Sequence, residues 1–373
     1  MMSDLSGGLV TEIFGEEVPA ASNQFLGFMM MDNRVCSLRS NLQGIRNDKE
    51  GGDLVDPFVV NQVSVLDQIE VSKVFHSDCL LLCVLKDNSR LLVWNPYLGQ
   101  TRWIQQRDSF HRLDNYAIGY DNKNRNHKVL RFVDYYLEEL VFGFEIYDFS
   151  SNSWRVLDVT PDWNIEFFQR GVSLKEGNSY FYAQEKLMPP EEGIESDEVD
   201  TTDLPVFLLC FDFTAERFGT RLPLPFHSHD EETVSLSCVR QEQLAVLYQH
   251  YDRCLEIWIT TKIEPSAVSW SMFLKVDMGP LTGFKFDVEA ASFLIDEDKR
   301  VAVVFDLDGY EQTETCRYQT AHIIGQNGGG YFKSVNIREA PNVGKPDRYG
   351  HTFRRYCVPL VCPSYVPSLV QLD

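Results

Sequence analysis

Few residues of this chain have the types and the spacing that chemistry requires. The run His227-Ser228-His229-Asp230 contains three side chains that bind metals in proteins, and alternate residues of a strand lie on the same face. The run comes one residue after Pro223-Leu224-Pro225, which is typical of an exposed loop. We therefore interpret it as a loop and keep a metal site as the alternative.

Aspartates on both sides of one apolar run suggest a second kind of metal site. Asp296 and Asp298 precede the run, Asp306 and Asp308 follow it, and carboxylate oxygens are the ligands that Ca²⁺ prefers. Aspartate is also typical of turns between strands, and we favour that interpretation.

Two enzyme motifs are absent or incomplete. Gly328-Gly329-Gly330 lacks the following Lys and Ser or Thr of a phosphate-binding loop. No G-x-S-x-G elbow presents a serine nucleophile, although a Ser-His-Asp arrangement on another scaffold stays open. The sequence thus predicts no catalytic residue, no cofactor and no metal.

The elements that must position any functional residue are short strands. In the stretch from Cys79 to Ile104, two apolar runs, Leu80–Leu85 and Leu91–Trp94, flank the polar turn 86–90. Apolar runs bounded by Asp, Asn and Ser predict a β-hairpin. A second turn at 95–99 leads to a third short run that contains Trp103.

This strand–turn–strand unit recurs along the chain. Aligned strands end in a bulky residue at spacings of 53, 64, 47 and 64, and a second aromatic residue follows each one. The first set is Trp94, Tyr147, Phe211, Trp258 and His322, and the second is Trp103, Trp154, Phe218, Trp270 and Tyr331. Spacings near fifty predict kelch-like propeller blades, with five units visible and a sixth available from the strands between residues 25 and 65. We interpret the eight Trp, Tyr and Phe residues among the first four pairs as blade-packing residues, with a ligand cage as the alternative.

Composition narrows the classes of protein. The chain has 373 residues, a net charge of −21 and nine scattered cysteines, which fits one large all-β domain with reduced, buried thiols. The negative charge argues against a nucleic-acid partner, and no apolar run is long enough to span a membrane. The first residues lack the features of a secretory signal, so we expect a cytoplasmic or nuclear protein. Residues 191–203 contain seven carboxylates and predict a solvated loop, with attraction of a basic partner as the alternative.

Several motifs occur in an order that resembles one known family. Leu91–Pro96 reads LLVWNP and Gly99–Ile104 reads GQTRWI; a turn at 116–121 (YAIGYD) and the runs EIYDFSSNSWR (145–155), GVSL (171–174) and CFDFTAERF (210–218) follow. Together they resemble the F-box-associated domain of plant F-box proteins over about residues 70–340. The resemblance implies an all-β, kelch-like β-propeller.

The first residues resemble the start of an F-box, a small helical unit that binds a Skp-type adaptor. The spacing of Leu5, Leu9 and Ile13 by four predicts one helical face within residues 4–14. Ser6 stands where the family pattern has Pro, and the later F-box helices are missing. We therefore expect a truncated F-box at 1–22, the propeller at 23–362 and a tail at 363–373. The residues that the resemblance assigns to adaptor binding are Leu5, Leu9, Val10, Ile13, Val18 and Pro19.

The resemblance implies a non-enzymatic substrate-recognition module of an SCF-type E3 ubiquitin ligase. Its partners would be an unidentified protein target and the Skp-type adaptor, with adaptor binding weakened or lost by the truncation. One alternative is a stand-alone propeller that binds the same targets without ubiquitination. A weaker alternative is a propeller hydrolase or lyase.

Overall fold

The computed structural model describes most of the chain. The described residues are 24–40, 57–77, 79–87, 89–105, 114–133, 143–165, 171–186, 204–229, 232–251, 254–281, 286, 292–308, 316–325, 331–342, 356, 358–363 and 365–372. Helix is scarce among them, with one 3₁₀ turn, η1 (Ser64–Leu66), and one short helix, α2 (Met278–Leu281). None of the described helices is long and apolar enough to cross a membrane.

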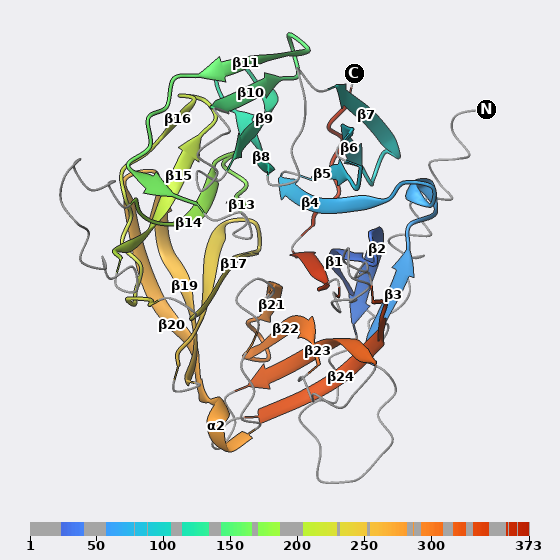
Figure 1. Ribbon diagram of the computed structural model, residues 1–373, viewed down its shortest axis with the longest axis vertical. Helices are drawn as coiled ribbons and strands as arrows, with labels where there is room; N and C mark the ends of the chain where they lie inside the picture. The colour runs from blue at the N-terminus through green and yellow to red at the C-terminus, as the bar shows by residue number, and fades with distance from the viewer. Residues whose placement is uncertain are drawn as a thin grey trace, which may run out of the picture.

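Six antiparallel sheets follow one another around a ring (Figure 1). Blade 1 contains β25 (Leu360–Pro363), β1 (Gln24–Met31), β2 (Arg34–Ser40) and β3 (Phe58–Gln62); blade 2 contains β4 (Val71–Ser77), β5 (Leu80–Leu85), β6 (Arg90–Asn95) and β7 (Gln100–Gln105). Blade 3 contains β8 (Asp114–Asp121), β9 (Asn126–Val133), β10 (Phe144–Asp148) and β11 (Ser153–Leu157); blade 4 contains β12 (Trp163–Asn164), β13 (Val172–Ser173), β14 (Ser179–Glu185), β15 (Val206–Asp212) and β16 (Arg217–Phe218). Blade 5 contains β17 (Thr233–Val239), β18 (Gln243–Gln249), β19 (Cys254–Glu264) and β20 (Ala267–Asp277); blade 6 contains β21 (Ser292–Asp296), β22 (Val301–Leu307), β23 (Arg317–Gly325) and β24 (Tyr331–Ala340).

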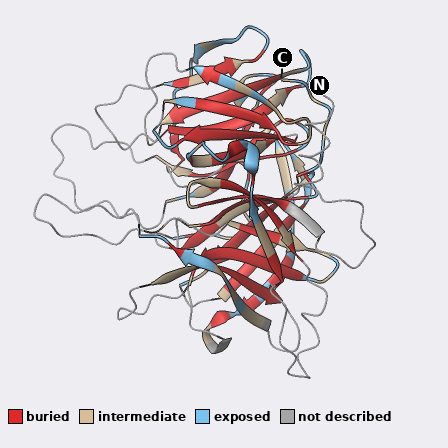
Figure 2. Cartoon of the chain, turned by 90° about the vertical axis from the view of Figure 1, so that its right-hand side faces the viewer, coloured by how far each residue is buried: buried red, intermediate tan, exposed pale blue. Residues whose placement is uncertain are grey.

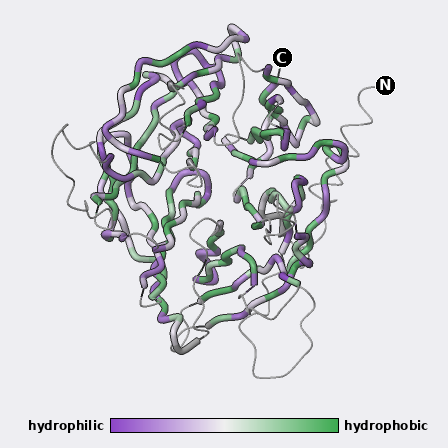
Figure 3. The backbone as a smooth tube through the Cα atoms, in the orientation of Figure 1, coloured by the Kyte–Doolittle hydropathy of each residue, from purple (hydrophilic) through white to green (hydrophobic). Residues whose placement is uncertain are grey.

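Apolar strands are buried on both faces because each blade lies between two others (Figures 2 and 3). In β5, Leu81 and Cys83 pack into the core shared with blade 1, whereas Leu80, Leu82 and Val84 pack into the core shared with blade 3. A strand with two buried faces needs apolar residues at every position, which explains the continuous run at 80–85. Comparable clusters fill every junction between consecutive blades, including the one between blades 6 and 1.

The predicted repeat is the repeat of the blades. All five aligned residues lie in the third strand of a blade, and all five following aromatics lie in the fourth. Four of the aligned residues pack into the core shared with the preceding blade, namely Trp94, Tyr147, Phe211 and Trp258. The fifth, His322, contacts Phe286 in the corresponding place before blade 6. The prediction of a kelch-like propeller is confirmed, and the strands from 24 to 62 do belong to a sixth blade.

The first strand of each blade lines the centre of the ring. Contacts join β25 to β4, β4 to β8, β8 to β13, β13 to β17, β17 to β21 and β21 back to β25. This closed series of contacts is the inner wall of the propeller. In blade 4 the inner position is divided between β12 and β13, which both pair with β14.

The two ends of the chain close the ring together. β25 pairs with β1 from Gly27↔Pro363 to Met30↔Leu360, so the last strand of the chain is the inner strand of blade 1. Gly27 has φ +149°, and a Cβ there would lie 2.3 Å from the carbonyl oxygen of Cys362. Only glycine permits this approach, because any side chain would push the closing strand away.

Two local predictions were wrong. The strands expected between residues 25 and 65 end at Gln62, and η1 follows, because the chain must turn there from the outer edge of blade 1 to the centre of blade 2. Residues 116–121, interpreted as a turn, belong to β8, whose side chains are almost all buried between neighbouring blades.

Candidate functional site: the two faces of the propeller

Antiparallel blades place their connections at two opposite ends of the ring. At one end, which we call the turn face, connections join the first strand to the second and the third to the fourth. Most of these are turns of two to five residues, with one long exception at 41–57. At the other end, the loop face, connections join the second strand to the third and each blade to the next. Several of these are long, namely 134–143, 186–205, 219–232, 278–291 and 341–359.

Charge is also divided unequally between the faces. The loop-face connections contain 27 Asp and Glu residues against 11 Lys and Arg, a balance of −16 out of the total of −21. The turn-face connections contain 10 against 8, a balance of −2. A surface with this excess of one sign attracts oppositely charged partners and repels like ones.

The turn face is locked by contacts between neighbouring blades. The ammonium of Lys128 in blade 3 lies 2.5 Å from Asp121 Oδ2 and 2.7 Å from Glu216 Oε1 in the turn of blade 4. The Lys128 side chain is 3% exposed and also donates to the carbonyl of Phe213 at 3.2 Å. Arg155 pairs with Glu216 from the solvent side. Four charged groups and one carbonyl thus join two blades.

The same junction brings two backbones unusually close. The Tyr120 amide donates to the Gly177 carbonyl at 3.1 Å. A Cβ on Gly119 would lie 2.1 Å from the Phe213 ring, and one on Gly177 would lie 2.4 Å from the Tyr120 carbonyl oxygen. Burial alone would raise the pKa of Asp121, but hydrogen bonds from Lys128 and Asn124 outweigh it and lower this pKa to about 2.

On the loop face, a buried carboxylate fixes two connections of blade 5 to each other. Glu232 accepts hydrogen bonds from the Tyr248 hydroxyl at 2.5 Å and from the backbone amides of His229 at 2.9 Å and Tyr251 at 3.2 Å. Burial raises the pKa of Glu232, but these donors together outweigh it, and the pKa falls below its ordinary value. The end of the 219–232 connection is therefore held beside the 250–253 connection.

A second buried ionic group supports the loop face at blade 3. Arg131 contacts Asp114 Oδ2 at 2.9 Å and Glu145 Oε2 at 2.8 Å, which joins three strands of one blade. Lys73 of blade 2 donates to the Asp114 carbonyl at 2.7 Å. Hydrogen bonds and ion pairs thus order the strand ends at both faces, and the faces differ in the length and charge of the connections that follow those strand ends.

Neither candidate metal site assembles from the residues that the structure describes, and Asp230 lies outside them. His227 and His229 have rings 4.9 Å apart, but no group of three or more His, Cys, Asp or Glu suited to a metal occurs in the part of the chain that the structure describes. Asp296 lies at the turn-face end of β21, where it accepts from Lys299, and Asp308 lies at the loop-face end of blade 6. The length of strand β22 separates these two aspartates, so they cannot share an ion.

The eight predicted packing residues occupy third and fourth strands, with different exposure. Trp94 and Phe211 are fully buried, and Tyr147 is 3% exposed. Trp154, Trp258 and Trp270 are half-buried and donate their indole N–H to Gln105 O, Glu256 Oε2 and Pro223 O. Phe218 packs half-buried against the core between blades 3 and 4. Trp103 is 37% exposed beneath the Arg90 guanidinium.

The predictions for the N-terminal segment concern residues that the structure does not describe. The predicted helix and the residues assigned to adaptor binding lie outside the described ranges; these residues are Leu5, Leu9, Val10, Ile13, Val18 and Pro19.

The C-terminal residues have contacts that the sequence did not predict. The residues after Pro363, expected to be a tail, pack along blade 2, where Asn95 and Gln100 bind them. The apolar triplet Leu360-Val361-Cys362 was the available sign that the chain ends in one more strand. The role of Glu232 had no signal in the sequence.

Comparisons with known proteins agree with this architecture. The model of the F-box associated beta propeller domain matches residues 26–372. An F-box/kelch-repeat protein of Arabidopsis thaliana is 58% identical over 368 residues, which covers 97% of this chain and 87% of that protein. An F-box protein of the same plant is 55% identical and covers 94% of this chain and 87% of its own length. One similar solved structure, the β-propeller domain of Cps50 (Swd1) from Myceliophteria thermophila, has a TM-score of 0.42 at 10% identity and covers 85% of this chain and 88% of its own. With six blades closed by its own last strand and a family match over nearly its whole length, the chain belongs to the F-box-associated β-propeller family.

Proposed function

We propose that this protein recognises a protein target through its loop face, as the substrate-recognition module of an SCF-type ubiquitin ligase. The observation that supports this role best is the division between the faces. A closed ring with tight, interlocked turns at one end carries long connections at the other, and such loops on a rigid scaffold are where proteins place their binding residues. The relatives' names, F-box and F-box/kelch-repeat, supply the link to ubiquitination.

The charge of the loop face indicates the class of target. A balance of −16 in its connections favours a partner with a basic surface, because the long-range field increases the rate of encounter. Such binding weakens as salt rises, since charges separated by more than about 8–10 Å are screened at physiological ionic strength.

The test is affinity capture with the full chain as bait at two salt concentrations. The loop-face variant replaces the seven carboxylates of 191–203 by Asn and Gln. The control variant replaces Glu176, Glu242 and Glu297 on the turn face by Gln. We expect the loop-face variant to lose targets that the wild type and the control retain. Equal capture by all three proteins would contradict recognition through the loop face.

Adaptor binding requires its own experiment. We infer that the segment with Leu5, Leu9 and Ile13 gives weak or no binding to a Skp-type adaptor, because the sequence retains only the first part of the F-box pattern. Pull-down of purified adaptor measures this directly, with Leu5→Asp and Leu9→Asp as control variants. Binding as strong as that of a complete F-box, and lost in both variants, would show that the segment is fully competent.

If the adaptor does not bind, the same loop face supports a stand-alone binding module. Such a module would hold the targets of its relatives without delivering them to the ligase. A reconstituted ubiquitination assay distinguishes the two roles, because only the ligase subunit transfers ubiquitin to the captured target. Both roles place the protein in the cytoplasm or nucleus, which a fluorescent fusion would test.

A further inference from the structure

Residues 365–372 lie as an extended segment across the turn-face end of blade 2. We call this segment the strap. At one end Tyr365 packs into the core between blades 1 and 2, and at the other Val370 and Leu372 pack against the core between blades 2 and 3. The strap follows β25 directly, so one continuous piece of chain contacts three blades.

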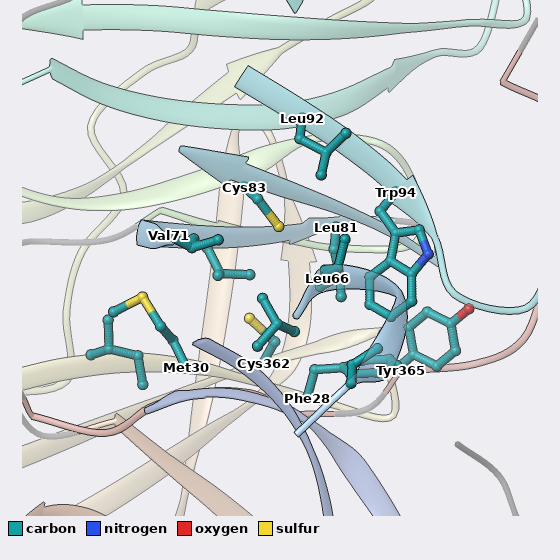
Figure 4. Packing of buried hydrophobic residues seen from close by; sticks show 14 of the residues in the cluster. Phe28, Met30, Leu66, Val71, Leu81, Cys83, Leu92, Trp94, Cys362 and Tyr365 are labelled. Carbon is teal, nitrogen blue, oxygen red and sulfur yellow. The ribbon is translucent and has the colours of Figure 1, made fainter. Parts of the chain in front are cut away.

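The anchor of the strap is aromatic. The Tyr365 ring lies 5.0 Å from the Phe28 ring in an edge-to-face arrangement, and Phe28 lies 5.4 Å from Trp94 in the same geometry (Figure 4). Tyr365 is 6% exposed, and burial raises the pKa of its hydroxyl. Edge-to-face pairs contribute beyond the burial of area, so Tyr365 holds the first part of the strap against the strand that contains Trp94.

The rest of the strap is bound by side-chain amides. Asn95 donates through Nδ2 to the carbonyls of Ser368 at 3.2 Å and Val370 at 2.7 Å. Gln100, the cross-strand partner of Asn95, donates to Gln371 Oε1 at 2.7 Å and accepts from the Leu372 amide at 3.1 Å. These amides satisfy the backbone of a segment that belongs to no sheet.

Asn95 has two duties that can be separated. Its Oδ1 accepts from the Tyr97 and Leu98 amides and so forms the turn that follows β6. Its Nδ2 is used only for the strap carbonyls among the contacts recorded for the described residues. Asn95 is fully buried, and an amide that serves both groups explains the asparagine at this position.

We propose that Trp94, Asn95 and Gln100 form a peptide-binding groove whose ligand is the chain's own extended C-terminal strap, and that filling it latches the ring shut. The ligand class is an extended peptide with one tyrosine anchor and two backbone carbonyls that have one residue between them, as Ser368 and Val370 do. The closing strand β25 has only four residues paired with β1, so the contacts of the strap add substantially to what holds it. This groove is independent of target recognition, because it lies on the turn face.

The test is hydrogen–deuterium exchange on the full-length protein with Asn95→Asp. Aspartate keeps the acceptor that forms the turn, removes both donated hydrogen bonds, and places a carboxylate against two carbonyl oxygens. Exchange of amides in 365–372 is expected to accelerate by about tenfold to a hundredfold, the loss of two hydrogen bonds, with a smaller increase in β25. The matched control is Asn122→Asp, because Asn122 also donates its side-chain amide to a turn-face carbonyl, that of Glu176, and does not contact the strap.

Two further measurements keep the proposal open to failure. Gln100→Ala removes the outer contacts of the strap and is expected to increase its exchange about threefold to tenfold, even if Asn95→Asp folds poorly. Carboxypeptidase should release residues from the C-terminus faster in both variants than in the wild type. Unchanged exchange and digestion in both variants, or equal effects in Asn122→Asp, would overturn the latch.

Discussion

The turn face and the loop face are the two ends of the same six blades, and they differ in the length of their connections, their charge and the contacts between neighbouring blades. At the turn face, neighbouring blades share a buried ion cluster and a backbone hydrogen bond, and at two glycines there is no room for a Cβ. At the loop face, connections of up to 20 residues carry most of the negative charge. One end of the ring is therefore held by contacts between neighbouring blades, whereas the other carries long, acidic connections. The difference places the contacts that hold neighbouring blades together at the turn face, and it is the reason for proposing target recognition at the loop face.

The largest expected effect comes from breaking the ion cluster of the turn face. Lys128→Met leaves Asp121 and Glu216 without their buried cation, and loss of one partner of such a group costs about 3–5 kcal/mol. Chemical denaturation of the two proteins measures the change in unfolding free energy.

The control for that variant touches the same cluster from outside. Arg155→Met removes a contact to Glu216 whose arginine side chain is 48% exposed, and an exposed pair contributes less than about 1 kcal/mol. If both substitutions destabilise the protein equally, burial does not distinguish the inner cation from the outer one, and the turn face is not held by its buried charges.

Acid should destabilise the ring through two buried histidines, and an exposed histidine of the loop face should not contribute. Burial lowers the pKa of His76 and of His322 to about 4, below the ordinary value of 6.5. A depressed histidine pKa contributes stability that is complete above pH 6.5 and lost as pH falls toward 4, about 3 kcal/mol for each residue when fully developed.

Unfolding free energy measured from pH 7 to pH 4 tests this contrast. We expect His322→Phe to reduce the acid sensitivity of the ring, whereas His229→Gln on the loop face, where the side chain is exposed, should leave it unchanged. An identical pH profile for the wild type and His322→Phe would mean that the buried imidazole does not resist protonation.

A single methyl group can compare the two faces at the level of packing. In Gly119→Ala at the turn face, the new Cβ would lie 2.1 Å from the Phe213 ring, and overpacking of this kind costs about 1–3 kcal/mol. In Gly143→Ala at the loop face, the nearest atom is Val156 Cγ1 at 3.8 Å, an ordinary contact, and the change should stay within about 0.5 kcal/mol. Thermal unfolding of both variants measures the difference, and equal melting temperatures would refute it.

The propeller could be predicted from the sequence because the packing between blades repeats along the chain. Aromatic residues such as Trp94 and Tyr147 recur in the third strand, where each faces the preceding blade, and this spacing is visible in one chain. The closing strand was missed because β25 is four residues long and its partner β1 lies more than 300 residues earlier. The Lys128 cluster was missed for a similar reason, since its members come from different blades and have no common spacing.

The smallest expected effect on stability is also the sharpest test of the division between the faces. Replacing residues 190–202 by a Gly-Ser linker of equal length removes six carboxylates from a connection whose ends, Glu185 and Val206, stay in paired strands. Unfolding free energy should change by less than about 0.5 kcal/mol, because loop-closure entropy depends mainly on length and the length is kept. Binding of a basic target should weaken and become less dependent on salt, since fewer charges take part in the encounter. A destabilisation as large as that of Lys128→Met would show that the loop is part of the scaffold. If stability, target binding and its salt dependence are all unchanged, the acidic segment does not belong to the recognition surface, and the shorter loops of this face must define it.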